Sequence, residues 1–409
     1  MVMEDIPKSF RVRSEDVTVF KDKHIGAGNF ADVFKGTYHK KGSKGGMEVA
    51  VKVIRAGPTL NSVEKESTPA WLHEIRNEAM IMTLFDQEHL ILLYGYSDVD
   101  MDASPFQPPF IVLEYCPGGS LDVYLQATKN ISVGEKVLYL KEVAAGMRFL
   151  EKEKIVHRDL ASRNVLINTC GLLKISDFGL SRSPNVKEMP ETTHNQIPIR
   201  WMAPESLLRT PTFDNKSDMW AYGVFIYEVF TAGKKPWPNK PVKWIATQIR
   251  KLQMPHLPSS MPKVIKDIIQ HKCWVKADER WTFAQLHSVL CLLSITLFTT
   301  SRASIYAYLE KKGVAQNSKG RDKVEKWDRD SSLVEWSETK DIAKHDTVPA
   351  RPVDGNCVLY SKKKGEKRER KNSKTNRELN KTPAISHTTT TSQGSSEDRN
   401  RESEGRKHA

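Results

Sequence analysis

Residues 155–180 read IVHRDLASRNVLINTCGLLKISDFGL, and the fold prediction starts from this stretch. Two apolar runs, at 165–167 and 172–175, flank a turn at Thr169-Cys170-Gly171, which predicts a small β-hairpin. A polar cluster, His157-Arg158-Asp159 with Asn164, precedes the hairpin, and Asp177-Phe178-Gly179 follows it. Loops at the ends of short strands can hold such side chains toward a ligand while the strands stay rigid. We therefore expect a ligand site where these strands end.

Three residues of this stretch, Asp159, Asn164 and Asp177, carry side-chain oxygens. Such oxygens suit a hard cation such as Mg²⁺, which takes few protein ligands and completes its shell with substrate phosphates. A remaining carboxylate would be free to orient a hydroxyl nucleophile. The pattern predicts phosphoryl transfer.

The order HRDLASRN and then DFG resembles the catalytic core of protein kinases. Either motif alone occurs by chance on ordinary loops, but their order and spacing argue against chance. The resemblance implies an α+β fold in two lobes, a small β-rich N-lobe and a larger helical C-lobe. It covers residues 17–297, the expected kinase domain, between a polar leader at 1–16 and a basic tail at 298–409 that we expect to be disordered.

Composition agrees with a globular domain and a basic tail. The chain has 409 residues, 39% hydrophobic content and a net charge of +13, of which +8 falls in residues 301–409. The five cysteines are scattered without a CxxC pair, which argues against a zinc site or a disulfide framework and for a reducing compartment. The start has no apolar core, and the longest apolar run, 289–298, is too short to span a bilayer. We expect a cytoplasmic protein, with the nucleus or the inner face of a membrane as alternatives through partners.

Residues 17–39 alternate apolar and polar residues around Gly26-Ala27-Gly28, which predicts another hairpin. The GxG and the following valine resemble the glycine-rich loop of kinases, whose backbone N–H groups cover the nucleotide phosphates. The resemblance implies that Ile25, Gly26, Gly28 and Val33 contact ATP. Ala31 stands where the third glycine is usual, and it is expected to stiffen the loop because alanine does not readily adopt positive φ.

Lys52 lies in the apolar segment EVAVKVI at 48–54. A lysine in such a strand is costly unless it is paired, although an edge-strand lysine could reach water. By the resemblance, Lys52 holds the α- and β-phosphates and is aligned by a glutamate of the helix predicted at 69–85. Glu74 and Glu78 both qualify, and Glu78 fits the family pattern better.

The segment FIVLEYC at 110–116 resembles the hinge between the lobes, whose backbone groups bind adenine. A plain core strand explains this segment locally just as well. On the hinge interpretation, Leu113 is the gatekeeper, and Glu114, Cys116, Ala50 and Leu166 complete the expected cofactor-binding set.

The C-terminal half contains several expected supports for the catalytic loop. The helical period over 132–152 predicts a buried helix that leads into this loop. Asp218 opens an apolar helix and is expected to anchor the backbone of the loop. The resemblance also implies that Arg280 pairs with Glu205, while Trp281 replaces the usual proline.

The residue choices around Asp159 favour tyrosine as the acceptor. Serine/threonine kinases usually have a lysine two residues after this Asp, but here Ala161 stands there and the cation is Arg163. DLASRN and PIRWMAPE resemble tyrosine kinases, in which Pro198 forms a platform for a phenol ring. Dual-specificity or serine/threonine-directed activity, a nucleotide-binding pseudokinase scaffold and a nucleic-acid binder are the alternatives.

The resemblance then assigns the roles. Asp159 accepts the proton of the substrate tyrosine, Asn164 and Asp177 hold Mg²⁺ or Mn²⁺ against ATP, and Arg163 offsets charge at the γ-phosphate. The expected partners are proteins that contain a target tyrosine.

Two further expectations concern control and location. Between Asp177 and Glu205 the chain contains no tyrosine, so Thr192 and Thr193 once phosphorylated, or Glu188 and Glu191 as fixed charges, would have to face Arg158. We expect a basally active kinase. The basic run at 362–377 is a solvated tail or a patch for nuclear import or polyanions.

Overall fold

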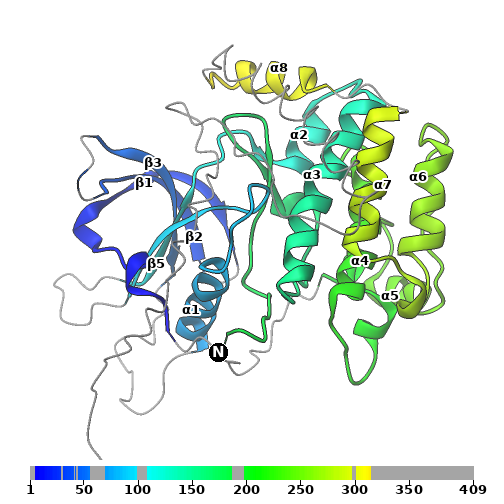
Figure 1. Ribbon diagram of the computed structural model, residues 1–409, viewed down its shortest axis with the longest axis horizontal. Coiled ribbons are helices and arrows are strands. Elements are labelled where there is room, and N and C mark those ends of the chain that lie inside the picture. The colour runs from blue at the N-terminus through cyan, green and yellow to red at the C-terminus, as the bar shows by residue number, and fades with distance from the viewer. Residues whose placement is uncertain are drawn as a thin grey trace, which may run out of the picture. The chain divides into compact units, whose positions relative to one another are not determined.

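Figure 1 shows the computed structural model, which describes residues 5–28, 31–40, 42, 45–55, 70–98, 108–186, 198–296 and 301–314. These residues all belong to one structural unit, residues 1–363. The predicted α+β architecture, a β-rich N-lobe followed by a helical C-lobe, is confirmed.

The N-lobe is a five-stranded antiparallel sheet in the order β1-β2-β3-β5-β4, with helix α1 packed against it. Four of the eight residues of the central strand β3 are buried, namely Val49, Ala50, Val51 and Ile54. The bounds are β1 Val17–Ala27, β2 Ala31–Tyr38, β3 Met47–Ile54, α1 Ala70–Met82, β4 Leu93–Ser97 and β5 Phe110–Glu114.

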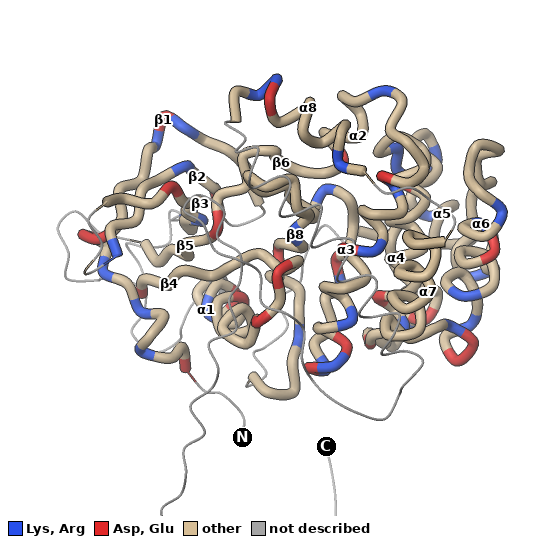
Figure 2. Tube along the Cα trace, turned by 45° about the horizontal axis from the view of Figure 1, so that its top comes forward, with Lys and Arg blue, Asp and Glu red and all other residues tan. Residues whose placement is uncertain are grey.

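The C-lobe is helical and carries a small three-stranded sheet in the order β6-β7-β8. The hairpin predicted from the opening stretch is β7–β8, and Figure 2 shows β8 between the N-lobe strands and the C-lobe helices. The bounds are β6 Gly119–Ser120, α2 Leu121–Ala127, α3 Val133–Lys152, β7 Val165–Ile167, β8 Leu173–Ile175, α4 Asn215–Phe230, α5 Val242–Arg250, α6 Lys263–Ile268, α7 Phe283–Thr296 and α8 Ala303–Lys311.

Short turns of 3₁₀-helix connect the main elements, and one π-helical turn follows α6. The 3₁₀ turns are η1 Lys8–Phe10, η2 Ser14–Asp16, η4 Ser162–Asn164, η5 Ile199–Trp201, η6 Pro204–Leu207 and η8 Ala277–Glu279, and the π-helical turn is η7 Ile269–Cys273.

The two central helices of the C-lobe begin at polar caps. Ser132 accepts the backbone N–H of Glu135 at the start of α3. Asp214 and Ser217 form a reciprocal capping box at the start of α4. Such caps satisfy N–H groups that a helix cannot bond internally. Helix α4 is buried almost all round, and α7 packs along α3 (Figure 1).

The structure differs from the sequence-based boundaries at both ends of the domain. Part of the expected leader is packed: Arg11 pairs with Asp98, and the N–H of Val12 donates to the carbonyl of Tyr96 in β4. Part of the expected disordered tail is helix α8. Its apolar residues Ile305 and Leu309, one helical turn apart, are fully buried. The folded part therefore extends beyond residue 297, at least through 314.

Polar contacts fix α8 to the C-lobe. Arg302 is 0% exposed, pairs with Glu142 of α3 and donates to the carbonyl of Gly171 at 2.6 Å. Glu135 accepts the first N–H groups of α8, including that of Ile305 at 3.1 Å. Gly171 has φ of 73°, and a Cβ there would lie 2.7 Å from Ile305, so both the turn and the helix contact require glycine.

The cysteines follow the expectation only in part. Cys116, Cys273 and Cys291 are buried free thiols. Cys170, which is partly exposed in the turn between β7 and β8, is disulfide-bonded. The scattered cysteines argued against a disulfide framework, and this partly exposed cysteine departs from that expectation.

Charge and helix length bear on the alternative functions. Basic and acidic residues are interspersed over the described elements, and neither sign gathers on one element (Figure 2). This distribution gives no support to a nucleic-acid-binding face within the described residues. None of the helices that the structure describes combines the length and the apolar character needed to cross a membrane.

Candidate active site

Strand register brings part of the predicted nucleotide-binding set onto one face of the N-lobe sheet. Val33 lies opposite Lys52, and Ala50 lies opposite Leu113. Directly opposed residues share a face, as do residues two apart on one strand. Gly26 lies opposite Val33 and joins the same face. The sheet thus presents these five residues together.

Other members of that set lie elsewhere. Ile25 falls in the irregular part of β1 between His24 and Gly26, and its side chain is 45% exposed. The Glu114 side chain, on the opposite face from Leu113, contacts Lys174 at 2.9 Å and Asn168 at 3.1 Å. Only its backbone could therefore serve adenine. Cys116 is buried after β5, and Leu166 lies in β7.

Ala31 does not strain the glycine-rich hairpin. It is the first residue of β2, is buried and pairs with Ile54 in β3, so extended backbone suffices there. Arg55 holds the hairpin from the end of β3, where it donates to the carbonyl of Gly28 and pairs with Asp32 at 3.1 Å. Sequence reasoning missed Arg55, although its place directly after the apolar strand could have suggested a contact with the neighbouring turn.

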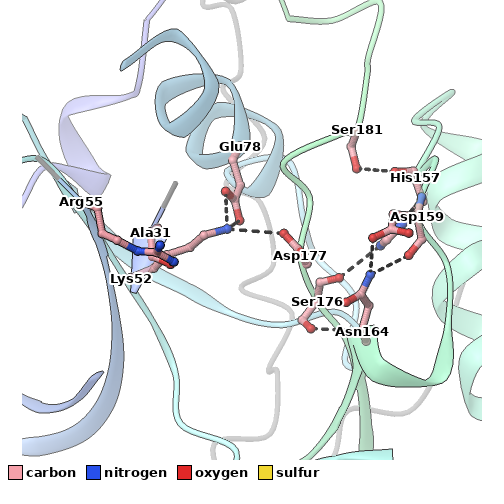
Figure 3. Close-up of polar contacts among 10 residues, drawn as sticks. All are labelled: Ala31, Lys52, Arg55, Glu78, His157, Asp159, Asn164, Ser176, Asp177 and Ser181. Atoms are coloured by element: carbon pink, nitrogen blue, oxygen red, sulfur yellow. Dashed lines mark hydrogen bonds and ion pairs between the residues drawn. The ribbon is translucent and has the colours of Figure 1, made fainter. Parts of the chain in front are cut away.

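Lys52 forms the ion pair predicted with Glu78 of α1. Its Nζ lies 2.8 and 2.7 Å from the two carboxylate oxygens, and Asp177 Oδ1 lies at 3.4 Å (Figure 3). Burial alone would lower the pKa of Lys52, but the charges of Glu78 and Asp177 outweigh it, so the pKa is raised. Lys52 is therefore charged at neutral pH. Glu74 forms no such pair with Lys52.

Phe178 fixes the position of the neighbouring Asp177. Its ring is fully buried between Phe85 at 4.5 Å and His157 at 4.9 Å between ring centroids. Asp177 has φ of 62° in the left-handed region, and its side chain is half exposed in the cleft. The charge of Lys52 holds the pKa of Asp177 below its usual range, against the effect of burial. The backbone of Asp177 is thus strained, and its ionised carboxylate is accessible from the cleft.

Asp159 is held by the two residues that the sequence grouped with it. Asn164 Nδ2 donates to the Asp159 carboxylate at 2.8 Å and to its carbonyl at 2.7 Å (Figure 3), and Arg163 pairs with the other carboxylate oxygen. Burial raises the pKa of Asp159 to about 6, while Arg163 opposes the shift. The guanidinium of Arg163 lies 4.3 Å from the ring centre of Trp201, a cation–π contact.

Buried acids anchor the backbone of this loop. Asp218 of α4 accepts the N–H groups of His157 at 2.8 Å and Arg158 at 3.0 Å, as predicted. Glu228, which sequence reasoning missed, accepts the N–H of Ser162 at 2.9 Å. Burial raises the pKa of Asp218 to about 7 and that of Glu228 to about 7. Helix α4 thus supplies two polar anchors, of which the sequence indicated Asp218 but not Glu228.

His157 also supports the loop from inside. Its Nε2 donates to the Ser176 carbonyl at 3.2 Å, and its Nδ1 accepts the N–H of Asp159 at 3.2 Å. Burial lowers the pKa of His157 to about 4, so the ring is neutral at pH 7. Ser181 and Ser176 donate to backbone carbonyls of the same loop (Figure 3).

The ion pair expected between Arg280 and Glu205 of the C-lobe is also present. Arg280 forms a two-pronged ion pair with Glu205 at 2.6 and 2.9 Å, as the resemblance implied. The Arg280 guanidinium is fully buried. Such bidentate pairs add geometric specificity.

One cavity of about 1180 Å³ gathers most of the polar site. The predicted residues on its wall come from both lobes and are Gly28, Lys52, Glu78, Asp159, Arg163, Asn164 and Asp177. The hinge-side residues Leu113, Glu114 and Cys116 are not part of this wall. Pro198, Trp201, Lys234 and Lys235 line its C-lobe side.

Asn164 and Asp177 offer oxygens that fit a magnesium ion. The side-chain contacts of Asn164 use its Nδ2, and Asp177 contacts Lys52 through Oδ1, so Asn164 Oδ1 and Asp177 Oδ2 are available to a ligand. Two such oxygens suit Mg²⁺ when phosphates complete its shell. Within the described ranges, no group of three or more His, Cys, Asp or Glu could hold a metal without such help.

Some expectations lie outside the described residues. These are the control residues Glu188, Glu191, Thr192 and Thr193, and the basic run at 362–377.

Comparison with known proteins agrees with this geometry. Residues 19–290 match the family model for protein tyrosine and serine/threonine kinases. The chain is 32% identical over 277 residues to Fer-related kinase 1 of Caenorhabditis elegans, which covers 67% of this chain and 65% of that protein. It is 31% identical over 298 residues to the mouse tyrosine-protein kinase Fer, 72% of this chain and 33% of that protein.

A further relative, from Caenorhabditis elegans, is named inactive tyrosine-protein kinase kin-32. It is 30% identical over 288 residues, 70% of this chain and 31% of that protein. The chain therefore spans less than two thirds of the length of each of these relatives.

Proposed function

Because the chain belongs to the family of protein tyrosine and serine/threonine kinases, we propose that it transfers the γ-phosphate of ATP to tyrosine hydroxyls of protein substrates in signalling. The observation that carries the proposal is one cavity lined by Lys52 with its partner Glu78, and by Asp159, Asn164 and Asp177. Each of these groups has a role in the phosphoryl-transfer template.

The proposed reaction depends on positioning and charge. Lys52, fixed by Glu78, neutralises the α- and β-phosphates of ATP. Asp159, whose pKa is about 6, is largely ionised at pH 7, accepts the proton of the attacking hydroxyl and aligns that oxygen with the γ-phosphorus. Asn164 and Asp177 would hold Mg²⁺, which supplies charge neutralisation at the phosphates when bound.

Two features favour tyrosine over serine. Position 161 is a fully buried alanine. Because alanine carries no charge, no side-chain cation reaches the cleft from that position, and Arg163 supplies the charge instead. Arg163 is packed on Trp201, beside Pro198, and all three line the cavity. The apolar side chains of Pro198 and Trp201, which line the same cavity as Asp159, suit a phenol ring, which extends farther from the backbone than a serine hydroxyl. The relatives named as tyrosine kinases support the same choice.

Two alternatives are kept, each for a specific reason. Tyrosine preference rests on a few side chains, so activity on serine or threonine is one alternative. A scaffold that binds nucleotide without transfer is the other, since one relative is named inactive. The intact Lys52–Glu78 pair and the presence of Asp159, Asn164 and Asp177 argue against it.

Phosphoamino-acid analysis separates these alternatives. The purified chain is incubated with ATP and Mg²⁺ on tyrosine-containing and serine-containing polymers. The proposal expects mainly phosphotyrosine. Mainly phosphoserine would favour the first alternative, and nucleotide binding with no product would favour the second. Action in the cytoplasm, and nuclear or anionic-surface targeting through 362–377, stay predictions.

A further inference from the structure

Helix α1, which carries Glu78, is held by three consecutive side chains that point in different directions. Successive residues of a helix are rotated by about 100° around its axis, so Arg76, Asn77 and Glu78 meet different surroundings. Glu78 pairs with Lys52 (Figure 3). Asn77 is buried, and its Nδ2 donates to the carbonyl of Ser181 at 3.3 Å. Arg76 makes its contacts away from the cavity wall.

Arg76 belongs to a cluster of two cations and two carboxylates, Asp5, Arg11, Arg76 and Asp98, which we call the leader cluster. Asp98 Oδ2 accepts from Arg11 Nη1 at 2.8 Å and from Arg76 Nη2 at 3.2 Å. Asp5 accepts twice from Arg11 Nη2, at 2.8 and 2.9 Å, and lies 3.7 Å from Arg76 Nη2. Because Asp98 directly follows β4, this cluster joins the leader, β4 and α1.

The part of the leader that supplies two members of the cluster is fixed by packing. Ile6 is 3% exposed and belongs to the main hydrophobic core. A Cβ on Gly95 of β4 would lie 2.2 Å from Cγ1 of Val12, so the leader and β4 are in close contact at this glycine. The leader precedes residue 19, where the match to the kinase family model begins. Its contacts are therefore additional to those within the matched segment.

The position of α1 needs support beyond its ion pair with Lys52. Glu78 is 4% exposed, and taking a carboxylate out of water costs free energy that the ion pair has to offset. Contacts elsewhere on the helix therefore decide how firmly it is held against β3. The leader cluster supplies such contacts at Arg76, two residues before Glu78.

We propose that Arg11 and Asp98 are positioning residues for phosphoryl transfer, which hold Arg76 and thereby keep α1 where Glu78 pairs with Lys52. The inference rests on the proposed function, because its effect is measured through that reaction. When α1 is displaced, Lys52 loses its fixed position, and the apparent affinity for nucleotide falls with the fraction of competent molecules.

The expected effect is moderate because the cluster is only partly buried. The side chains of Arg11, Arg76 and Asp98 are 31%, 31% and 35% exposed. A single ion pair of this kind contributes little, but each of the substitutions below breaks two pairs at once. We expect a loss of kcat/KM for Mg-ATP of about three- to tenfold.

The test measures kcat/KM for Mg-ATP, with a saturating tyrosine polymer, in the full chain and in the variants Arg11→Gln and Asp98→Asn. The two substitutions disrupt the cluster from different elements, and thermal unfolding shows whether each variant is folded. Arg13→Gln is the matched control, because Arg13 is exposed in the same leader and pairs with Asp16 of the leader itself. All three substitutions are also made in the Glu78→Gln background.

Arg11→Gln and Asp98→Asn should each lower kcat/KM about three- to tenfold, whereas the control should keep the wild-type value. In the Glu78→Gln background they should cause no further loss, since the pair that they support is already gone. A merely structural effect would multiply with the loss from Glu78→Gln.

Wild-type kcat/KM in both cluster variants, or losses that multiply, would overturn the inference and leave the proposed function intact. A wild-type chain that does not phosphorylate the tyrosine polymer would overturn both.

Discussion

Replacing Arg302 by alanine should unfold the domain at markedly lower temperature. Arg302 is 0% exposed and is paired with Glu142, whose side chain is also buried. Among the described residues, the substitution leaves that buried carboxylate with the N–H of Leu173, at 3.0 Å, as its hydrogen-bond donor, and it removes the 2.6 Å hydrogen bond to the carbonyl of Gly171. Breaking a buried pair by removing one partner costs about 3–5 kcal/mol.

The assay is urea and thermal unfolding of the full chain. At about 2–4 °C per kcal/mol for a domain of this size class, the melting temperature should fall by roughly 10 °C. Lys311→Ala is the matched control because Lys311 is exposed on the same helix, and it should stay within about 0.5 kcal/mol of the wild type.

A double variant separates the ion pair from packing. Arg302→Met/Glu142→Met removes both charges and keeps apolar volume, so it should lose less stability than Arg302→Ala. If Arg302→Ala unfolds within 1 kcal/mol of the wild type (less than the ~3 kcal/mol lower bound), α8 is not the integral part of the domain that its contacts indicate.

Three further predictions concern activity. Glu78→Gln should lower kcat/KM by about 100-fold, because Lys52 loses its fixed position, whereas Glu74→Gln should change it little; steady-state kinetics on one tyrosine polymer compares them. Since Asp159 must be ionised to accept a proton and its pKa is about 6, kcat/KM should rise with pH up to about 6 and level off above it; a profile flat from pH 5 to 8 would contradict this role, given the ~6 midpoint. Tyrosine-specific phosphatase should leave the initial rate unchanged and Glu191→Lys should lower it; a large loss on phosphatase treatment would mean that a tyrosine outside the loop controls activity.

The core of the site was predictable because its residues lie in short motifs that resemble those of the kinase family. The spacing of Asp159, Asn164 and Asp177 is set within one loop–hairpin–loop unit. Lys52 in an apolar strand demands a partner, and Glu78 supplies it. The position of Asp218 at the start of an apolar helix likewise indicated a buried anchor.

What was missed depends on contacts between distant segments. Helix α8 is short and is followed by polar sequence, so composition hid Ile305 and Leu309 at helical spacing. The bulge that exposes Ile25 arises from strand pairing with β2, which the sequence of β1 alone does not fix. The left-handed backbone of Ala232 and Trp237 has no residue signature, since both types normally avoid it.

The central claim, transfer of phosphate to tyrosine with Asp159 as the base, is tested most directly by comparing wild type and Asp159→Asn. Mg-ATP affinity is measured by titration, and the transfer rate on a tyrosine polymer is measured in parallel. The account predicts transfer by the wild type, and for Asp159→Asn little change in nucleotide affinity with a rate about 100- to 10,000-fold lower. A wild-type chain that binds Mg-ATP without phosphorylating tyrosine, or an Asp159→Asn chain that keeps the wild-type rate, would contradict it.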